Sequence, residues 1–379
     1  MNVIILNTNS FGGNYEYSRC LAEAYAANKE VHSCAVLIPS NALQPANDIF
    51  KKELISDIPR IKNKLYRKFY FLYRSFINPL KTFFFLRKQP ASIVVFNDYE
   101  QITSLLWVPL FRSLKKKHEF LVILHDPDRD HYLPVKTLSV LTMKKVMSIM
   151  DLALYHEVLP DKIYYRLPIP KINVPHGIYD FKEQDYSFLE KLKKEKGTDR
   201  LLGMLGNIRD EKNYKLVIES LPDLPGTKLL IAGEQASSDV PVKEYKERIE
   251  ELNLQDRIIW MQKRLTDEEL QAAISICDVI LLYYKKSFAS QSGILNLIAL
   301  HKKTVIVSDT PSALTETVRK FGLGKIIPEE SSEFVSAIHT VFNTNMLNLD
   351  QQWSVYISYA SWENHVQTVI NNLQVNKSK

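Results

Sequence analysis

The sequence predicts an α/β protein made of two doubly wound domains with mainly parallel sheets. The chain has 379 residues, which is too long for one ordinary hydrophobic core. Short runs of branched apolar residues alternate with helical stretches from end to end, as in sheets built from strand–helix–strand units. Hydrophobic residues make up 45% of the chain, which is typical of a well-packed globular protein.

The first half contains six runs of the buried-strand type. They span residues 2–6, 33–38, 92–96, 120–125, 153–156 and 172–177. Helical stretches such as residues 15–27 lie between these runs. A charged stretch at residues 190–200 has the composition of a linker or an exposed helix, and we expect the second half to begin after it.

The second half contains five more expected strands, separated by helices with apolar positions three or four residues apart. These strands span residues 201–206, 228–233, 257–262, 278–284 and 304–309. Two halves of similar size with the same alternation indicate two domains of one architecture.

Cysteine usage and the N-terminus predict the compartment. Cys20, Cys34 and Cys277 are scattered and include no CxxC pair, so neither a disulfide framework nor a zinc site is indicated, and the compartment is expected to be reducing. Residues 1–13 have a short apolar stretch and no basic leader, which predicts a first strand and no signal peptide. No window approaches the roughly 18 apolar residues of a membrane span. We therefore expect a cytoplasmic protein.

Doubly wound sheets bind ligands at the carboxyl ends of their strands. Polar residues and glycines gather at those ends in this chain, at residues 8–14, 125–131, 174–177, 206–213, 232–235, 262–267 and 288–293. These segments are where candidate site residues are expected.

The segment GNIRDEKN (206–213) predicts an anion site in the second domain. Gly206 ends a buried strand, and Arg209 and Lys212 lie near the start of the next helix. Free N–H groups at a helix start favour anions, and two cations beside them suit a diphosphate. A capped surface helix with solvated charges is the alternative.

The segment FASQSGILNLIAL (288–300) has the same pattern. Ser292 can cap a helix, and Gly293 lets a ligand approach the backbone. The apolar run 294–300 is expected to be core. We predict that its start at Ser292 and Gly293 seats a phosphate.

Two segments of the first domain are candidates. Gly12 and Gly13 follow the first strand and precede a helix, although a tight turn explains them equally well. His125 and Asp126 end a buried strand, and Pro127 keeps Asp126 out of the helical conformation. This histidine could orient a sugar hydroxyl or stabilise charge during transfer; a structural histidine is the alternative.

These motifs, in this order, resemble those of GT-B fold glycosyltransferases close to glycosyltransferase family 4. The resemblance rests on GGNYEYSRCLAEAY, HDPDRDH, VPHGIYDF, GNIRDEKN, KLLIAGE, DRIIWMQKRLTDEELQAAISICDV and ISYASWENHV. It implies two Rossmann-like domains facing a cleft: an acceptor domain over residues 1–185, completed by a returning helix at 352–379, and a nucleotide-sugar-binding domain over 186–351. The implied reaction retains the stereochemistry of the donor sugar and needs no cofactor beyond the nucleotide sugar. We expect no metal, because no acidic pair of the DxD type lies at a suitable strand end; Asp128 and Asp130 in the His125 loop have this spacing by accident.

The resemblance also implies roles for single residues. Lys212 falls on the family's phosphate-binding lysine, whereas Arg209 lies two positions after the usual arginine, where this chain has Asn207. His125, with Asp126 beside it, falls on the histidine near the transferred sugar. The implied donor-binding residues are Gly12, Gly13, Gly206, Arg209, Lys212, Gly233, Lys263, Arg264, Ser292, Gly293 and Asn296. The backbone around Lys263 is expected to meet the base.

The chain departs from the family at two positions. Many members carry two glutamates eight residues apart where this chain has Ala289 and Leu297. No carboxylate is then left to grip the ribose, and Asn296 is the neighbour that could substitute. A catalytically silent nucleotide-sugar-binding protein or partner subunit is therefore an alternative to a transferase acting in bacterial-type polysaccharide or cell-surface glycan synthesis. A GT-B epimerase is a third hypothesis, but few carboxylates are available to move protons.

The net charge of +6 is concentrated in residues 51–88, which carry eleven Lys or Arg against two acidic residues. Aromatic residues such as Phe69 and Phe76 are interleaved with these cations. The combination suits the headgroup layer of an anionic membrane, and a peripheral location at the inner membrane face would suit a lipid-linked acceptor. A domain helix whose cationic stems cover core aromatics and a nucleic-acid surface are the alternatives; we do not expect a nucleic-acid partner.

Overall fold

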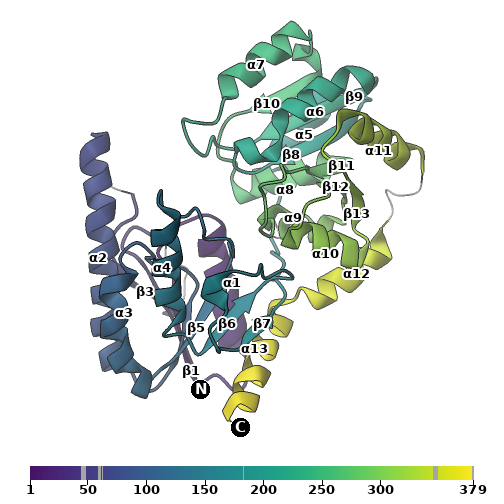
Figure 1. Ribbon diagram of the computed structural model, residues 1–379. Helices are drawn as coiled ribbons and strands as arrows, with labels where there is room; N and C mark the ends of the chain where they lie inside the picture. The colour runs from purple at the N-terminus through teal and green to yellow at the C-terminus, as the bar shows by residue number, and fades with distance from the viewer. Residues whose placement is uncertain (44–47, 59–60, 62, 182, 345–348, 378–379) are drawn as a thin grey trace. The chain divides into compact units, whose positions relative to one another are not determined.

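The computed structural model describes residues 1–43, 48–58, 61, 63–181, 183–344 and 349–377 (Figure 1). The chain divides into two compact units. Unit 1 comprises Met1–Gly177 with Ser361–Lys379, and unit 2 comprises Ile178–Ala360. No helix in the described parts of the chain is both long and apolar enough to span a bilayer.

Unit 1 is built on a seven-stranded parallel sheet of order β3-β2-β1-β4-β5-β6-β7. Its strands are β1 (Asn2–Leu6), β2 (Ser33–Pro39), β3 (Phe50–Leu54), β4 (Ile93–Phe96), β5 (Glu119–Leu124), β6 (Leu152–Tyr155) and β7 (Lys171–Asn173). The central strands are buried on both faces, which explains their continuous apolar runs.

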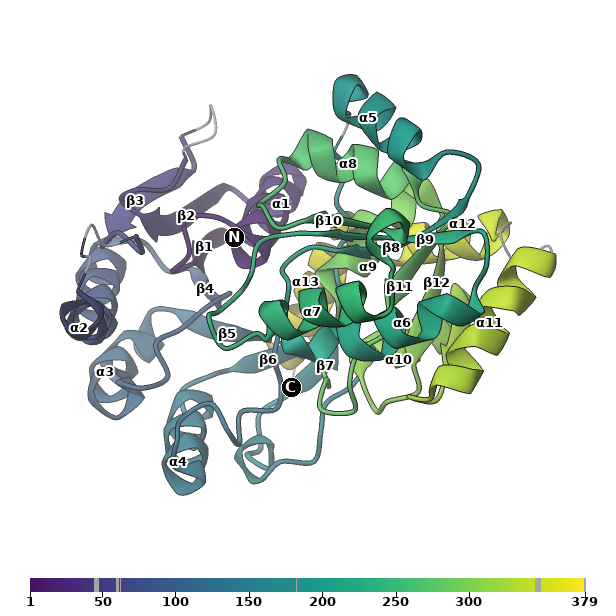
Figure 2. The ribbon, with the colours of Figure 1, turned by 90° about the horizontal axis from the view of Figure 1, so that it is seen from above.

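Two helical layers cover this sheet. On one face lie α1 (Gly13–Ala27) and α13 (Trp362–Lys377), whose apolar residues share a core with Val3, Ile5 and Val36. On the other face lie α2 (Lys64–Lys88), α3 (Ser104–Arg112) and α4 (Lys136–Met147). Figure 2 shows these three helices side by side along one side of the sheet.

Unit 2 repeats this plan with a six-stranded parallel sheet of order β10-β9-β8-β11-β12-β13. Its strands are β8 (Arg200–Leu205), β9 (Thr227–Ala232), β10 (Ile258–Met261), β11 (Val279–Leu282), β12 (Thr304–Ser308) and β13 (Gly324–Ile327). Its helices are α5 (Tyr186–Lys196), α6 (Tyr214–Ser220), α7 (Val242–Glu251), α8 (Asp267–Ile276), α9 (Gly293–Leu297), α10 (Ala313–Phe321), α11 (Ser331–Asn343) and α12 (Asp350–Tyr359).

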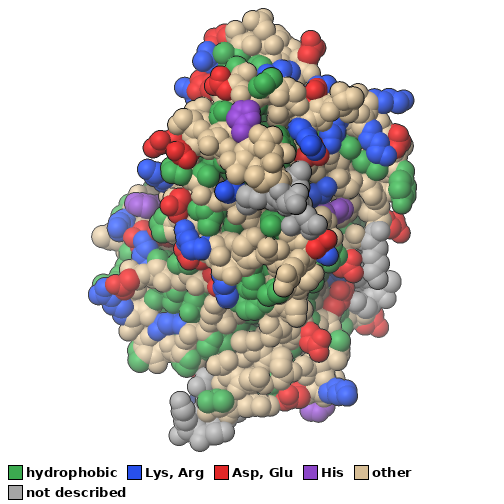
Figure 3. Space-filling view, turned by 90° about the vertical axis from the view of Figure 1, so that its right-hand side faces the viewer, with side chains coloured by type: hydrophobic (Ala, Val, Ile, Leu, Met, Phe, Trp, Pro, Cys, Tyr) green, Lys and Arg blue, Asp and Glu red, His purple; other side chains and the backbone are tan. Residues whose placement is uncertain are grey.

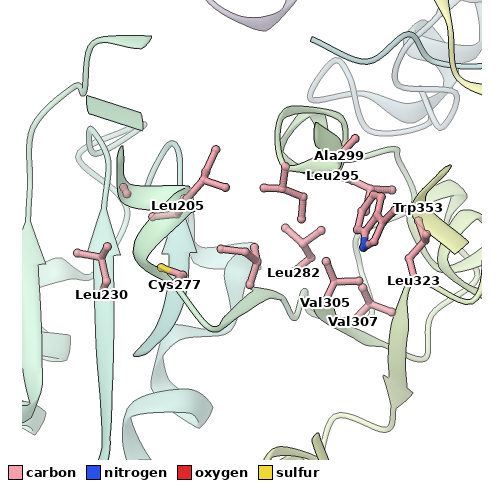
Figure 4. Close-up of a cluster of buried hydrophobic side chains, with 14 of the residues drawn as sticks. Leu205, Leu230, Cys277, Leu282, Leu295, Ala299, Val305, Val307, Leu323 and Trp353 are labelled. Carbon is pink, nitrogen blue, oxygen red and sulfur yellow. The ribbon is translucent and has the colours of Figure 1, made fainter. Parts of the chain in front are cut away.

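The core of unit 2 includes residues from outside the sheet and its neighbouring helices. Leu205, Leu230 and Val305 project from the strands toward Leu295 of α9, and Trp353 of α12 lies in the same cluster (Figure 4). Trp353 is fully buried. Helices α6, α7 and α11 form a second core on the opposite face.

The prediction of one helix over residues 352–379 is wrong. This stretch holds two helices, because α12 ends at Tyr359 and α13 begins at Trp362. Trp353 and Tyr356 bury α12 in unit 2, so only α13 packs against unit 1. Residues 178–185 likewise join unit 2, since the Ile178 N–H donates to the Ala360 carbonyl at 2.9 Å. The division therefore falls at Gly177 and Ser361, where the sequence placed boundaries at 185/186 and 351/352.

Two strands and one helix also differ from expectation. The strands β3 and β13 were not predicted; each lies at the edge of its sheet, and the middle three residues of β3 are exposed, so neither has a long buried run. The apolar run expected as one helix at 294–300 forms α9 of five residues and a short 3-10 turn at Ala299–His301.

Replacing Trp353 tests the role of α12 in unit 2. Trp353→Ala would leave a cavity in the cluster of Figure 4 and should lower the free energy of unfolding by about 3–5 kcal/mol. Val355→Ala on the same helix is the control; its side chain is 56% exposed, so the change should stay within about 0.5 kcal/mol. Urea unfolding followed by circular dichroism measures both. Equal midpoints for the two variants would contradict the placement of α12 in the core.

Candidate functional site

Parallel strands bring their carboxyl ends to one edge of a sheet, where ligands bind in doubly wound folds. In unit 2 this edge carries the loops after β8, β9, β10 and β11. In unit 1 it carries the loops after β1, β4, β5, β6 and β7. The predicted site residues other than Asn296 lie in loops or at helix starts along these two edges.

Glycines bring the ends of β8 and β9 into close contact. A Cβ on Gly233 would come 2.1 Å from the carbonyl oxygen of Gly206, so the two loops could not approach as they do with any larger residue. Gly206 has φ of 81°, in the region that favours glycine. A Cβ there would also meet Ile294 of α9 at 2.9 Å. The structure thus brings predicted donor residues Gly206 and Gly233 together with the start of α9.

Lys212 lies beneath this contact with its ammonium buried. Its Nζ donates a hydrogen bond to the carbonyl oxygen of Leu205, the last residue of β8, at 2.5 Å. Burial and, next, the nearby charge of Arg209 lower the pKa of Lys212 to about 7. A Cβ on Gly206 would lie 3.6 Å from this Nζ, so the ammonium lies close to the Gly206 backbone. An anion above Gly206 would restore the full charge of Lys212.

Arg209 is exposed at the same loop, and it takes part in none of the ion pairs recorded for the described residues. The residues after it are fixed. Asp210 pairs with Lys285 at 2.6 Å and accepts from the Tyr245 hydroxyl at 2.8 Å. The anchored backbone holds the Arg209 guanidinium beside Lys212 while leaving it open to solvent. Two cations, one buried and one exposed, therefore lie at the end of β8.

The start of α9 is only partly available to a ligand. Ser292 is buried; its hydroxyl lies 3.1 Å from the Tyr284 hydroxyl, and its N–H donates to the Gln291 side chain at 3.0 Å. Gly293 is exposed, with open space where a Cβ would be. Of the predicted phosphate seat, Gly293 is therefore the residue at the surface.

Asn296 does not lie at the surface of the site. It is fully buried, and its Oδ1 accepts from the Tyr356 hydroxyl of α12 at 2.5 Å. Its carbonyl accepts the Tyr179 N–H at 3.3 Å. The expected substitution of Asn296 for a ribose-binding carboxylate has no support in this arrangement, because the side chain joins α9 to α12.

The predicted base loop follows β10, next to the end of β9. Lys263 and Arg264 are both exposed there. Lys263 pairs with Glu269 at 2.6 Å, and its ammonium lies 5.3 Å from the centre of the Phe188 ring. The side chain of Lys263 is thereby directed to α8 and α5, which leaves the loop backbone as the part that could meet a base.

In unit 1, Gly12 and Gly13 form an open start to α1. Gly12 has φ of 83° and is the N-cap residue, and Gly13 begins the helix. A Cβ on either glycine would meet nothing within 4 Å. Both glycines therefore lie at a helix start with room for a ligand, next to the segment where Thr8 and Asn9 donate to Asp98.

His125 follows β5 and is partly buried. Its Nε2 lies 2.7 Å from Oδ1 of Asn97 at the end of β4, and the Asn97 amide donates to the Asn14 carbonyl of α1 at 3.0 Å. Because Asn97 Oδ1 accepts, Nε2 carries the proton. Burial, and next the positive character of His156 and His176, hold the pKa of His125 well below its ordinary value. The imidazole is therefore neutral near pH 7.

Sequence reasoning missed the group to which His125 belongs. His156 and His176 follow β6 and β7, and His365 comes from α13; all three rings lie within 6.0 Å of the Tyr17 ring centre. The Tyr17 hydroxyl reaches His156 Nε2 and His365 Nδ1, each at 3.5 Å. Burial lowers the pKa of His156 to about 4 and that of His365 to about 3. The signal in the sequence was a histidine at three successive strand ends.

The carboxylates near His125 face other partners. Asp128 and Asp130 both pair with Lys162, at 2.8 and 3.0 Å, and the pKa of Asp130 is lowered in this network. Asp126 is exposed, and its carbonyl accepts from Arg129 Nε at 2.9 Å. Among the described residues there is no group of three or more His, Cys, Asp or Glu side chains placed to hold a metal ion.

Comparisons with known proteins identify a family that unit 2 matches and solved structures with the same fold. Residues 187–357, nearly all of unit 2, match the model of the family described as "Glycosyl transferases group 1". A search of curated proteins found no match. Solved structures with the same fold include HepE from Anabaena in complex with UDP, which is 12% identical over 99% of this chain and 100% of that chain, with a TM-score of 0.71.

Two further solved structures have the same fold. Sucrose-phosphate synthase from Thermosynechococcus elongatus is 15% identical over 100% of both chains, with a TM-score of 0.70. A glycosyltransferase from Rickettsia africae is 15% identical over 100% of this chain and 98% of that chain, also with a TM-score of 0.70. At such identities the likeness establishes the fold. The prediction of a GT-B architecture with two Rossmann-like domains is confirmed.

The buried Lys212 makes a testable contribution to stability. Its pKa falls from 10.5 to about 7 on folding, so the unfolded chain binds more protons between these values and stability rises with pH across this window. In Lys212→Met this contribution disappears. Between pH 7 and 9 the wild type should gain about 2 kcal/mol in the free energy of unfolding relative to Lys212→Met. Urea titrations at both pH values measure the difference, and parallel pH profiles would show that folding does not lower the pKa of Lys212.

Proposed function

We propose that this chain, whose residues 187–357 match the glycosyl transferases group 1 family, moves a sugar from a nucleoside diphosphate sugar to a glycan or lipid-linked glycan. The resemblance to GT-B glycosyltransferases and the prediction of a glycosyltransferase are confirmed by that match together with the fold; the closer resemblance to family 4 remains part of the proposal. The donor, the acceptor, retention of configuration, metal independence and a role in bacterial-type polysaccharide synthesis are parts of the proposal.

The buried ammonium of Lys212 carries the proposal for donor binding. Burial lowers the pKa of this lysine to about 7, so keeping it charged inside the protein costs free energy. A diphosphate at Gly206 would offset that cost by pairing with the ammonium. Arg209 approaches the same place from solvent, and Gly293 adds an open backbone position. HepE binds UDP and UDP-glucose according to its solved complexes. We therefore take uridine diphosphate sugars as the first donors to test.

The same cations support the chemistry. Cleavage of the sugar–phosphate bond transfers negative charge to the leaving diphosphate. Lys212 and Arg209 would stabilise that charge, and because the loop is anchored through Asp210 and Lys285, little reorganisation is needed during the reaction. His125 and Asp126 of unit 1 remain our prediction for the polar groups at the transferred sugar, with Gly12 and Gly13 on the donor phosphates.

A catalytically silent nucleotide-sugar-binding protein is the second candidate. The observation that favours it is the replacement of two glutamates by Ala289 and Leu297, together with the engagement of Asn296 by Tyr356. Release of UDP from UDP-glucose, followed with and without added glycan acceptors, separates the candidates. Tight UDP binding with no turnover across a panel of nucleotide sugars would favour the silent protein.

Lys212→Met tests the donor site directly. Loss of one charge-assisted contact should weaken UDP binding by about 1.5–3 kcal/mol, roughly 10- to 100-fold in Kd. Lys215→Met, three residues later and exposed on α6, is the matched control and should bind as the wild type does. Isothermal titration calorimetry at pH 8 also reports proton uptake, which the wild type should show and Lys212→Met should lack, since UDP raises the pKa of Lys212. An unchanged Kd would remove Lys212 from the site.

His125→Ala tests the role of unit 1. The single N–H of the neutral His125 imidazole donates to Asn97 Oδ1, which leaves Nδ1 as an acceptor. If Nδ1 accepts from a hydroxyl of the transferred sugar, loss of the ring should lower the turnover number by about 100-fold, while the Kd for UDP stays unchanged. His131→Ala removes an exposed histidine of the same loop and should leave turnover as in the wild type. A sugar-transfer assay at saturating donor measures both variants. Equal turnover for the two would assign His125 a structural role only.

A further inference from the structure

The outer surface of α2, α3 and α4 is unusually apolar for a protein surface. Fourteen large apolar side chains on these three helices are exposed, whereas the whole of unit 2 exposes three among its described residues. The fourteen are Leu65, Tyr66, Phe69, Phe71, Leu72, Tyr73, Phe76, Leu80, Phe84, Leu105, Leu106, Leu110, Leu138 and Leu141. Because the helices lie side by side on one face of the sheet (Figure 2), these side chains gather on one side of unit 1.

The same helices lack acidic residues. Neither Asp nor Glu occurs in α2, α3 or α4, whereas every other described α-helix longer than five residues carries at least one. Seven Lys or Arg residues lie in α2 alone. We call the outer surface of α2, α3 and α4 the acid-free face. Elsewhere cationic and anionic side chains are interspersed, as the view in Figure 3 shows.

The long helix α2 separates its side chains into stripes. Residues 65, 69, 72, 76, 80 and 84 are apolar, exposed and three or four residues apart, so they share one side of the helix. Arg67, Arg74, Lys81 and Lys88 recur every seven residues and form a second stripe beside the first. The remaining side, including Ser75 and Leu86, is buried against unit 1. An apolar stripe with a cationic flank is the pattern of a helix lying in a membrane interface.

The packing of α2 keeps this surface in place. Pro79 cannot donate to the Ser75 carbonyl, and the Thr103 hydroxyl before α3 donates to that carbonyl instead, at 2.6 Å. Arg74 donates to the Thr8 carbonyl in the loop after β1. The C-terminal half of α2 is therefore fixed to the unit, while nearly all of residues 65–73 are exposed. Exposed apolar side chains on an anchored helix indicate a partner that covers them.

We propose that the acid-free face docks on the surface of an anionic lipid bilayer. Charge complementarity selects this occupant. The elements α2, α3, the Ser113–Lys116 turn and α4 carry thirteen Lys or Arg and no carboxylate, and only Lys115 and Lys136 among these thirteen pair with carboxylates recorded on neighbouring described segments, Asp151 and Asp130. Apolar side chains beside them enter the headgroup layer. The basic segment 51–88 is thus both core helix and surface helix, and the docking surface extends beyond it to Leu106 and Leu141.

The composition of the face argues against nucleic acid. Single-stranded nucleic acid is held by aromatic rings on which bases stack within a basic groove. Eight of the fourteen exposed apolar residues are leucines, including all five on α3 and α4. Leucine gives no stacking surface but partitions readily into hydrocarbon. Docking on a bilayer is independent of the proposed donor site, although it suits an acceptor carried on a lipid.

Flotation of the full chain with vesicles tests the proposal. The protein should float with vesicles of phosphatidylcholine mixed with phosphatidylglycerol, and less with phosphatidylcholine alone or at high salt. Each basic residue near an anionic surface contributes a factor of about five to partitioning, so the triple variant R67Q/K81Q/K88Q should partition about 100-fold less. The charge-matched control is K191Q/K194Q/K243Q on the exposed surfaces of α5 and α7, which should float as the wild type does.

A second pair of variants tests the part of the face outside α2. Leu106→Ser combined with Leu141→Ser removes side chains that are 59% and 51% exposed and should reduce flotation at least tenfold without unfolding the chain. Tyr186→Ser combined with Val355→Ser in unit 2 is the control, at 75% and 56% exposure. UDP titration of every variant reports the donor site, so loss of flotation with normal UDP affinity separates the two proposals.

Four outcomes would overturn the proposal. The wild type could stay unbound to anionic vesicles at low salt, or R67Q/K81Q/K88Q could float as the wild type does. Light scattering could show a dimer that the Leu106→Ser and Leu141→Ser variant dissociates while no vesicle binding occurs; the face would then join two copies of the chain. Finally, the protein could bind single-stranded RNA and not vesicles, and R67Q/K81Q/K88Q could abolish that binding. This result would assign the face to nucleic acid.

Discussion

The contact between the Lys212 ammonium and the Leu205 carbonyl ties the end of β8 to the loop that follows it. A buried ammonium needs a hydrogen-bond acceptor, and here the acceptor is the carbonyl of the last residue of β8. Gly206 turns the chain away with a positive φ, and Gly233 lets the neighbouring loop close over the turn. Arg209, Asp210 and the start of α9 are then placed around a single charge. The arrangement is costly without an anion, which is the physical reason to regard it as a binding site.

Unit 1 arranges its polar residues differently. Its edge holds neutral imidazoles around Tyr17, and their low pKa values follow from burial and from one another's proximity. Asn97 links His125 to the first turn of α1, and α13 supplies His365 from the far end of the sequence. The Asn97 amide oxygen fixes the N–H of His125, so the other ring nitrogen can accept a hydrogen bond without adding charge. Cations on one unit and neutral acceptors on the other suit diphosphate and sugar recognition respectively.

Much of this molecule could be predicted from sequence because parallel strands are buried on both faces. Central strands such as β5 and β11 are continuous apolar runs. The edge strand β3 contains Lys51, Lys52 and Glu53, and these polar residues interrupt the apolar pattern by which a strand is predicted. The rule that ligands meet strand ends selected Gly206 and Lys212, which lie together at the end of β8. The burial of Asn296 could not be predicted, because the direction of its side chain depends on Tyr356, which lies in a helix the sequence assigned to the returning segment. The histidine cluster was missed because adjacency of β5, β6 and β7 follows only from sheet order.

The two units show where such a fold can vary. Both bury the central strands of their sheets, so neither these strands nor the inner helix faces can differ much in polarity without loss of stability. The strand-end loops and the outer helix surfaces are free of that constraint, and there the units differ most. In unit 2 the cations of the candidate site lie in a strand-end loop, whereas in unit 1 the acid-free face carries many cations. Screening limits electrostatic attraction to about 10 Å at moderate salt. If the acid-free face docks as proposed, the attraction acts only when the face is turned toward the bilayer, so its composition would set the orientation of unit 1 as well as its affinity.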